Sequence, residues 1–109
     1  MTVKELCEKM ELSVLTLPDG DREIHGAYCC DLLSWVMGRA KADDVWITIM
    51  SNSNIVAVAS LADTACILLA EGVELDDNVK AIAEAKGINV LTSKKTAYEL
   101  ASQLSSFLK

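Results

Sequence analysis

The segment Ser51-Asn52-Ser53-Asn54 has the residue types best suited to ligand binding in this sequence. It follows a continuous run from Val45 to Met50, which predicts a buried strand, and precedes the run from Ile55 to Ala62, which predicts a buried helix. In open α/β sheets, ligands bind outside the carboxyl ends of the strands, where free N–H groups at a helix N-terminus attract anions. These four residues are therefore candidate contacts for a phosphate or a nucleotide, and a plain helix cap is the alternative.

His25 is the only histidine, so any Ser-His-Asp or Cys-His catalytic system would have to use it. No nucleophile motif accompanies it, and an exposed strand histidine is the alternative to a polar cluster with Asp21 and Arg22. The phosphate-binding pattern GxxxxGK followed by Ser or Thr is absent, and so is the dinucleotide-binding pattern GxGxxG. We therefore predict no catalytic residues and a protein that is not an enzyme.

Four cysteines are present, and no two of them have the CxxC spacing that is typical of metal sites. Cys29 and Cys30 are adjacent, which suits neither a tetrahedral metal site nor a disulfide between them. The main interpretation is that all four fill space in a reduced core, and an iron–sulfur or zinc site is the alternative (Cys7, Cys29, Cys30 and Cys66). The sequence therefore predicts no metal and no cofactor.

The composition excludes several classes of protein. The 109 residues fit one domain over 1–109, and 51% of them are hydrophobic, which is enough for a buried core. A net charge of −6 with scattered basic residues argues against nucleic acids and anionic membrane surfaces as partners. No apolar run reaches the about 20 residues that cross a bilayer, and charged residues stand where a secretory leader would be apolar. We expect a cytoplasmic protein with no membrane partner.

The first half of the chain predicts a less regular set of elements. A helix is expected over 3–10, and it opens with a capping box at Thr2. Strands are expected over 12–17 and 22–29, joined by the turn Pro18-Asp19-Gly20-Asp21. These two strands are expected to add an edge pair to the sheet.

A short helix is expected next, with Asp31 as its cap, and Gly38 is expected to loosen or end it. Its inner face would carry four apolar side chains (Leu32, Leu33, Val36 and Met37). Trp35 lies roughly 130° from the middle of that stripe at the helical period of 100° per residue. We therefore interpret Trp35 as a candidate interface anchor, and packing against a loop is the alternative.

The second half alternates strands with helices. Strands are expected at 45–50, 66–70 and 89–91, and helices at 55–62, from Asp76 to a stop at Gly87, and from a capping box at Thr96 onward. Such alternation predicts parallel strands joined by right-handed crossovers, with helices on the faces. The expected fold class is α/β, a three-layer α/β/α arrangement with a mainly parallel central sheet.

Five stretches, taken in order, resemble the DRTGG domain family. They are Asp21-Arg22-Glu23-Ile24 with Gly26, Asp31-Leu32-Leu33-Ser34, Val45-Trp46-Ile47-Thr48-Ile49, Asn54-Ile55-Val56-Ala57-Val58-Ala59 and Leu68-Leu69-Ala70-Glu71-Gly72. The similarity covers nearly the whole chain. Glu23 stands where the name-giving motif has threonine, and Gly26 is displaced from the glycines of that motif.

The resemblance implies a compact α/β domain similar to the N-terminal domain of the kinase that acts on the phosphocarrier protein HPr. The family also occurs between CBS domains in regulated inorganic pyrophosphatases, where it helps to form the dimer and borders an adenine-nucleotide regulatory site. Kinase activity is not implied, since the phosphate-binding loop is absent from this sequence.

These observations favour a non-catalytic regulatory or protein-interaction module that forms a homodimer and has an unknown protein partner. The alternative is a domain that senses an adenine nucleotide or another phosphate ligand through residues 51–54 together with Asp21 and Arg22. The Asp21-Arg22 pair also has a purely structural interpretation, in which it ties the turn to the sheet. A catalytic or metal-cluster role for His25 or the cysteines is a third hypothesis.

Overall fold

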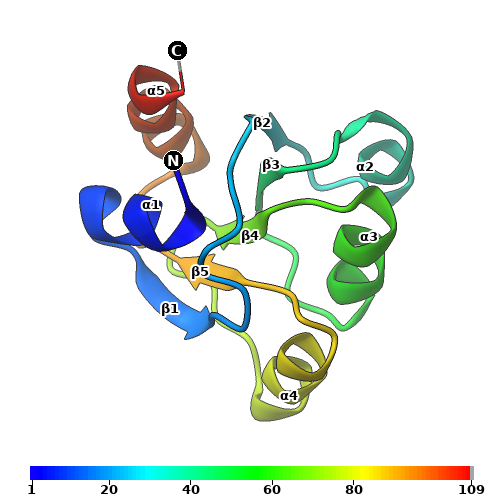
Figure 1. Cartoon of the computed structure of the whole chain (residues 1–109). Coiled ribbons are helices and arrows are strands. Elements are labelled where there is room, and N and C mark those ends of the chain that lie inside the picture. Colours follow the sequence, from blue (N-terminus) through cyan, green and yellow to red (C-terminus); the bar gives the residue numbers. More distant parts are fainter. Residues whose placement is uncertain (109) are drawn as a thin grey trace.

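The computed structural model describes residues 1–108, which form five helices and five strands (Figure 1). The helices are α1 (Val3–Met10), α2 (Leu33–Arg39), α3 (Asn54–Ala62), α4 (Asp77–Ala85) and α5 (Ala97–Phe107). The strands are β1 (Ser13–Thr16), β2 (Gly26–Cys29), β3 (Asp44–Thr48), β4 (Cys66–Leu69) and β5 (Val90–Thr92). Every element predicted for the second half is present, with ends that differ from the prediction by one or two residues.

The strands form one sheet in the order β1-β5-β4-β3-β2. Strands β2, β3, β4 and β5 run parallel to their neighbours, and β1 pairs antiparallel with β5. All residues of β3, β4 and β5 are buried, which is why these strands have apolar sequences without alternation. The prediction of a mainly parallel central sheet is confirmed.

The predicted edge pair in the first half is wrong, because β1 and β2 lie at opposite edges of the sheet. Backbone carbonyls in the connection between them accept hydrogen bonds from the first N–H groups of α1. Val3 N–H donates to the Arg22 carbonyl at 3.0 Å, and Lys4 N–H donates to the Gly20 carbonyl at 2.9 Å. Residues 17–25 therefore pass across the sheet instead of turning back as a hairpin, and β2 begins only at Gly26.

Two layers of helices cover the sheet, as predicted for a three-layer fold. Helices α1 and α5 lie on one face, and α2, α3 and α4 lie on the other (Figure 1). The side chains of β3 alternate between the two cores: Val45 and Ile47 face α1 and α5, whereas Trp46 faces the other three helices. Successive strand residues point to opposite faces, so a buried central strand contributes to both cores.

The helix ends follow the local signals in the sequence. Capping boxes are present at Thr2 with Glu5 and at Thr96 with Glu99, as predicted. The Asp76 side chain caps α4, and α4 ends before Gly87, whose φ of +73° suits a residue without a Cβ atom. Among residues 1–108, no helix has the length and the apolar character needed to cross a bilayer.

The prediction for α2 needs two corrections. Asp31 does not cap this helix, because its carboxylate accepts from the Thr48 hydroxyl at 2.7 Å and from Ile49 N–H at 3.0 Å. The helix ends at Arg39, one residue after Gly38. Only part of the predicted inner face is buried: Val36 and Leu33 point inward, and two members of the stripe are exposed (Leu32 and Met37). The helix has only 7 residues, so it buries a narrow stripe.

Candidate functional site

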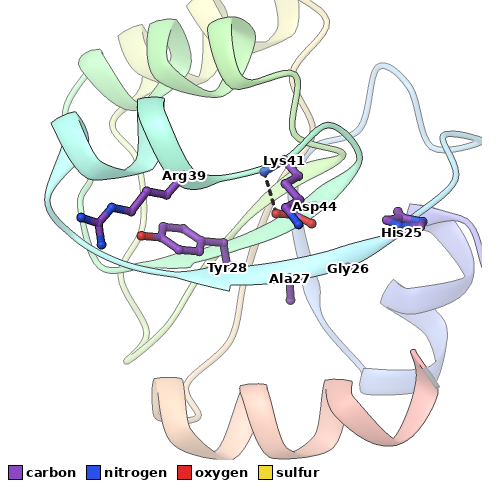
Figure 2. A pocket seen from close by; sticks show the side chains of 7 residues that line it. All are labelled: His25, Gly26, Ala27, Tyr28, Arg39, Lys41 and Asp44. Carbon is purple, nitrogen blue, oxygen red and sulfur yellow. Dashed lines mark hydrogen bonds between the residues drawn. The ribbon is translucent and has the colours of Figure 1, made fainter.

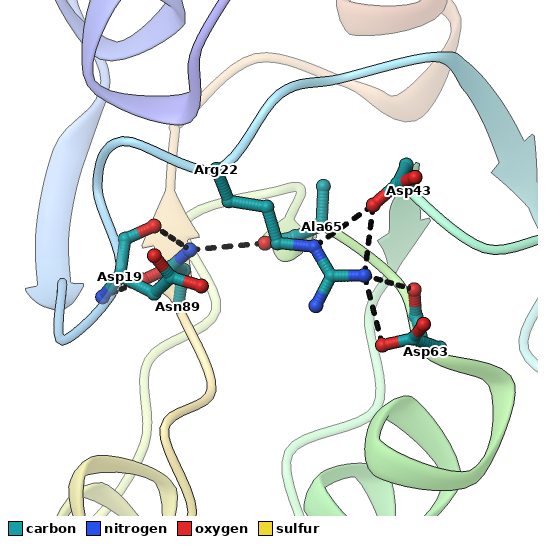
Figure 3. Close-up of polar contacts among 6 residues, drawn as sticks. All are labelled: Asp19, Arg22, Asp43, Asp63, Ala65 and Asn89. Atoms are coloured by element: carbon teal, nitrogen blue, oxygen red, sulfur yellow. Dashed lines mark hydrogen bonds and ion pairs between the residues drawn. The ribbon is translucent and has the colours of Figure 1, made fainter.

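Arg22 lies in the connection between β1 and β2, and its guanidinium joins two aspartates that precede neighbouring strands (Figure 3). Nε and Nη2 donate to Asp43 Oδ1 at 3.0 and 2.8 Å. Nη2 also donates to the Asp63 carbonyl at 2.7 Å and to Asp63 Oδ1 at 2.8 Å. Asp43 comes directly before β3, and Asp63 ends α3 shortly before β4. The guanidinium therefore ties the connection to the amino ends of two interior strands.

Both aspartates have a left-handed backbone, with φ of 68° at Asp43 and 59° at Asp63. Asp tolerates this conformation better than most residues, because its short polar side chain finds local partners. Burial alone lowers the pKa of Arg22, but the hydrogen bonds to Asp63 and Asp43 raise it, and the net shift is upward. Asp21 is exposed and takes no part in the contacts of Arg22. Arg22 is thus used to hold the fold together.

Asn89 holds the same connection from the side of β5. Its side chain is buried at 1% exposure, and it accepts from Asp19 N–H at 2.9 Å. Its amide nitrogen donates to the carbonyls of Asp19 at 2.8 Å and Ala65 at 3.0 Å (Figure 3). Asn89 and Arg22 together attach the connection to the residues that precede β3, β4 and β5.

The predicted binding segment, residues 51–54, follows β3 and leads into α3, and its four side chains are exposed. Asn52 Oδ1 accepts from Asn54 N–H at 2.9 Å, and the next two N–H groups donate to backbone carbonyls at 3.3 and 3.2 Å. Ser53 occupies the cap position without a side-chain cap bond. The first three N–H groups of α3 therefore already have acceptors within the chain, so they are not free to bind an anion.

The structure does not bring the two predicted parts of the ligand site together. Arg22 lies at the amino ends of the parallel strands, and residues 51–54 lie at their carboxyl ends. The five residues of β3 separate them, and at about 3.3 Å per residue this strand spans roughly 15 Å. Ser53 and Asn54 instead line a shallow groove of about 450 Å³ between α3 and α4, with Ile82 and Lys86 on its far side.

A groove that the sequence did not reveal lies along β2, on the side of α2 (Figure 2). It has a volume of about 310 Å³ and is lined by strand residues and by two cations from the end of α2 and the residues after it (His25, Gly26, Ala27, Tyr28, Arg39, Lys41 and Asp44). Neither Arg39 nor Lys41 makes a salt bridge with another described residue. The Asp44 carboxylate accepts from the backbone N–H of Lys41 at 2.8 Å. The groove offers positive side chains beside an aromatic ring.

Trp35 lies in the first turn of α2 with 48% of its surface exposed. The Arg39 guanidinium stacks on its ring at 3.7 Å from the centroid. Leu32 and Ile49 are also about half exposed and lie near the carboxyl ends of β2 and β3. The sequence prediction that Trp35 points away from the core of its own helix agrees with this exposure.

The remaining candidates for chemistry do not converge. Cys7 and Cys66 are buried, as predicted, and Cys30 is partly buried and packs against the core on the side of α2, α3 and α4. Cys29 is exposed, so the prediction that it fills the core is wrong. All four thiols are free. In the part of the chain that the structure describes, no group of three or more His, Cys, Asp or Glu residues is placed to hold a metal ion. His25 is exposed at the end of the groove along β2.

Comparison with known proteins identifies the family. The model of the DRTGG domain matches residues 22–107. The crystal structure of the CBS and DRTGG domains of the regulatory region of Clostridium perfringens pyrophosphatase, complexed with the activator diadenosine tetraphosphate, has a similar fold, with a TM-score of 0.71 and 12% sequence identity. That match covers 94% of this chain and 45% of the other chain, so this chain spans less than half of its length. A comparison with curated proteins finds no match. Because the family model matches most of its residues, this chain belongs to the DRTGG domain family.

Proposed function

We propose that this chain is a cytoplasmic, single-domain, non-catalytic regulatory module that acts as a homodimer. The observation that supports dimerisation is the exposure of three large apolar side chains near the carboxyl ends of β2 and β3 (Leu32, Trp35 and Ile49). Large aromatic side chains that become buried on association dominate the energy of protein interfaces. The regulatory role is supported by the structural neighbour, which belongs to the regulatory region of a pyrophosphatase.

Sedimentation equilibrium of the purified chain tests the dimer. The expected mass is twice the 11.8 kDa of one chain, and Trp35→Ser is expected to lower it toward 11.8 kDa. The matched control is Tyr98→Ser, because Tyr98 is an aromatic residue with 81% exposure on α5, on the opposite face of the sheet. A wild-type chain that is monomeric at high micromolar concentration contradicts the proposal, and so does a Trp35→Ser variant that dimerises like the wild type.

A second candidate function is the sensing of an adenine nucleotide or another phosphate ligand. It is supported by the cations Arg39 and Lys41 in the groove along β2, which make no salt bridge with another residue in 1–108. It is also supported by the structural neighbour, which was crystallised with diadenosine tetraphosphate. Arginine and lysine are the usual side chains for phosphate recognition. This function places the ligand at a different site from the one that the sequence predicted.

Calorimetric titration with AMP, ATP and diadenosine tetraphosphate tests this second function. Saturable binding that is lost in Arg39→Ala and Lys41→Ala places the ligand in the groove along β2. If binding is instead lost in Asn52→Ala or Arg22→Ala, and circular dichroism shows an intact fold, the ligand binds at the site predicted from the sequence. Absence of heat with all three nucleotides, from a folded sample, contradicts the sensing of an adenine nucleotide.

A further inference from the structure

Strand β2 is an open edge of the sheet. It pairs in register with β3 on one side, and no other strand among the described residues lies on its other side. Its sequence Gly26-Ala27-Tyr28-Cys29 has no charge, no proline and no bulge. Edge strands are normally protected by such features against pairing with other chains. The opposite edge strand differs, because the register of β1 shifts between Val14 and Thr16.

Two grooves flank this edge, one on each face of the sheet. The first is the groove on the α2 side, whose cations, Arg39 and Lys41, are exposed, whereas its one carboxylate, Asp44, is buried. The second has a volume of about 280 Å³, lies on the α5 side, and is mostly apolar (Gly26, Ala27, Ala101, Leu104, Ser105 and Leu108). Gly26 and Ala27 line both grooves. Figure 2 shows the side chain of Ala27 pointing away from Tyr28, toward α5.

The first residue of β2, Gly26, has no room for a side chain. A Cβ atom on Gly26 would lie 2.9 Å from Asp44 Oδ1, which is too close for a real contact. Any larger residue there would have to displace a carboxylate that is itself held by the backbone N–H of Lys41. The start of β2 therefore carries no side chain at a position that lines both grooves.

We propose that the free edge of β2 binds an extended segment of a partner protein as an added strand, with acidic and apolar side chains in alternation. Backbone hydrogen bonds to an edge strand supply affinity, and pockets for alternate side chains supply specificity. Side chains on one face of a strand repeat about every 7 Å, so alternate residues of the segment enter opposite grooves. Acidic side chains face Arg39 and Lys41, and apolar side chains face α5.

The charges decide which occupant fits. Arg39 and Lys41 have no salt-bridge partner among residues 1–108, so an incoming carboxylate completes their pairing. A second copy of this chain pairing through its own β2 brings no acid, because that strand is uncharged. The proposal deepens the proposed function, since it names the kind of protein partner, but it does not depend on the homodimer.

The test uses the full chain and a blocked peptide of sequence ELEVELE. Calorimetry is expected to give saturable binding, and hydrogen exchange is expected to slow at the amides of residues 26–29. The matched control is the peptide EELVLEE, which has the same composition without alternation and is expected to bind much more weakly. Equal affinity for the two peptides, or binding of ELEVELE without protection of β2, overturns the proposal.

A charge swap on exposed residues tests the polar groove without disturbing the core. The double variant Arg39→Glu with Lys41→Glu is expected to bind ELEVELE about tenfold more weakly, because two exposed pairs become repulsive. It is expected to prefer the peptide KLKVKLK. The control Lys86→Glu changes an exposed cation in the groove between α3 and α4, and it is expected to leave both affinities unchanged. No change of preference in the double variant overturns the proposed chemistry.

Other occupants give distinct results in the same experiment. If the amides of β2 are already protected in the free protein and lose protection on dilution, a second copy occupies the edge and the proposal fails. If ATP alone protects them and displaces the peptide completely, the groove is an anion site and the proposal also fails. If the chain is monomeric and binds ELEVELE as expected, the proposal for β2 is supported and only the homodimer is contradicted.

Discussion

Arg22 contacts Asp63 at two points, donating to its carbonyl oxygen at 2.7 Å and to its carboxylate at 2.8 Å. Asp63 is the residue at the end of α3, and its backbone has a left-handed conformation. The guanidinium therefore donates hydrogen bonds both to a backbone carbonyl at the helix end and to the carboxylate of the same residue. Because Arg22 belongs to the connection between β1 and β2, this contact fastens the irregular first half of the fold to the regular second half.

We expect Arg22→Ala to lower the free energy of unfolding by about 1–2 kcal/mol, because it removes several charge-assisted hydrogen bonds from a partly exposed site. Arg22→Lys should recover little of this loss, since one ammonium does not reproduce the planar guanidinium. Urea unfolding followed by circular dichroism measures the effect. The control is Lys41→Ala, which removes an exposed cation that makes no salt bridge with another residue in 1–108. Equal stabilities of Arg22→Ala and Lys41→Ala contradict this account.

Asn89→Ala should cost more, about 2–4 kcal/mol, because it leaves the buried Ala65 carbonyl and the partly buried Asp19 N–H without their partner. Asn52→Ala is the matched control: it removes an exposed asparagine whose side chain accepts a single hydrogen bond, from Asn54 N–H. Thermal unfolding of the two variants under identical conditions compares them. A smaller loss for Asn89→Ala than for Asn52→Ala would show that Asn89 is not needed to hold the connection.

The two capping boxes predict a pH dependence of stability. The backbone N–H of Thr2 holds the pKa of Glu5 below its usual range, and Thr96 does the same for Glu99. A carboxyl group with a lowered pKa in the folded state stabilises the fold above its unfolded pKa, and this contribution is lost as the pH falls through the folded pKa. Part of the stability present at neutral pH should therefore disappear between about pH 5 and pH 3.

Replacing both glutamates tests the origin of that dependence. The double variant Glu5→Gln with Glu99→Gln keeps a side-chain acceptor at each cap but has no proton to bind, so its stability should fall less over this pH range. The double variant Glu8→Gln with Glu84→Gln removes two exposed carboxylates outside the capping boxes, and it is the control for the change of net charge. Urea titrations at several pH values give the comparison. Identical pH profiles for the double variant and the wild type would remove the capping boxes as the cause.

The thiols should differ in reactivity. Burial raises the pKa of Cys66 and of Cys7, so both are expected to react with an aromatic disulfide reagent only after unfolding. Cys29 is exposed and should react first, at a rate that increases above neutral pH because burial and the Asp31 carboxylate raise its pKa. Mass spectrometry of the labelled protein identifies the site, and Cys29→Ser should remove the fastest phase. Rapid labelling of Cys66 in the native state would contradict the buried position of β4.

Several features of the fold follow from residues that lie close together in the sequence. The capping boxes at Thr2 and Thr96 and the cap at Asp76 were predictable, because a cap side chain reaches only the next turn of its own helix. The strand from Asp44 to Thr48 was also predictable, since a continuous run of β-branched and apolar residues is typical of an interior strand that is buried on both faces. The alternation of these elements was enough to indicate a parallel α/β sheet.

Other features depend on contacts between distant parts of the chain. The sequence placed Asp31 at a helix cap, but the structure uses it to bind Thr48 in a neighbouring strand. It grouped Arg22 with residues 51–54, and the order of the strands puts them at opposite ends of the sheet. The groove along β2 combines His25 with Arg39 and Lys41, which no local pattern connects. Local hydrogen bonds specify where a helix begins, whereas the choice of sheet edges depends on long-range pairing and on the path of the connection that crosses the sheet.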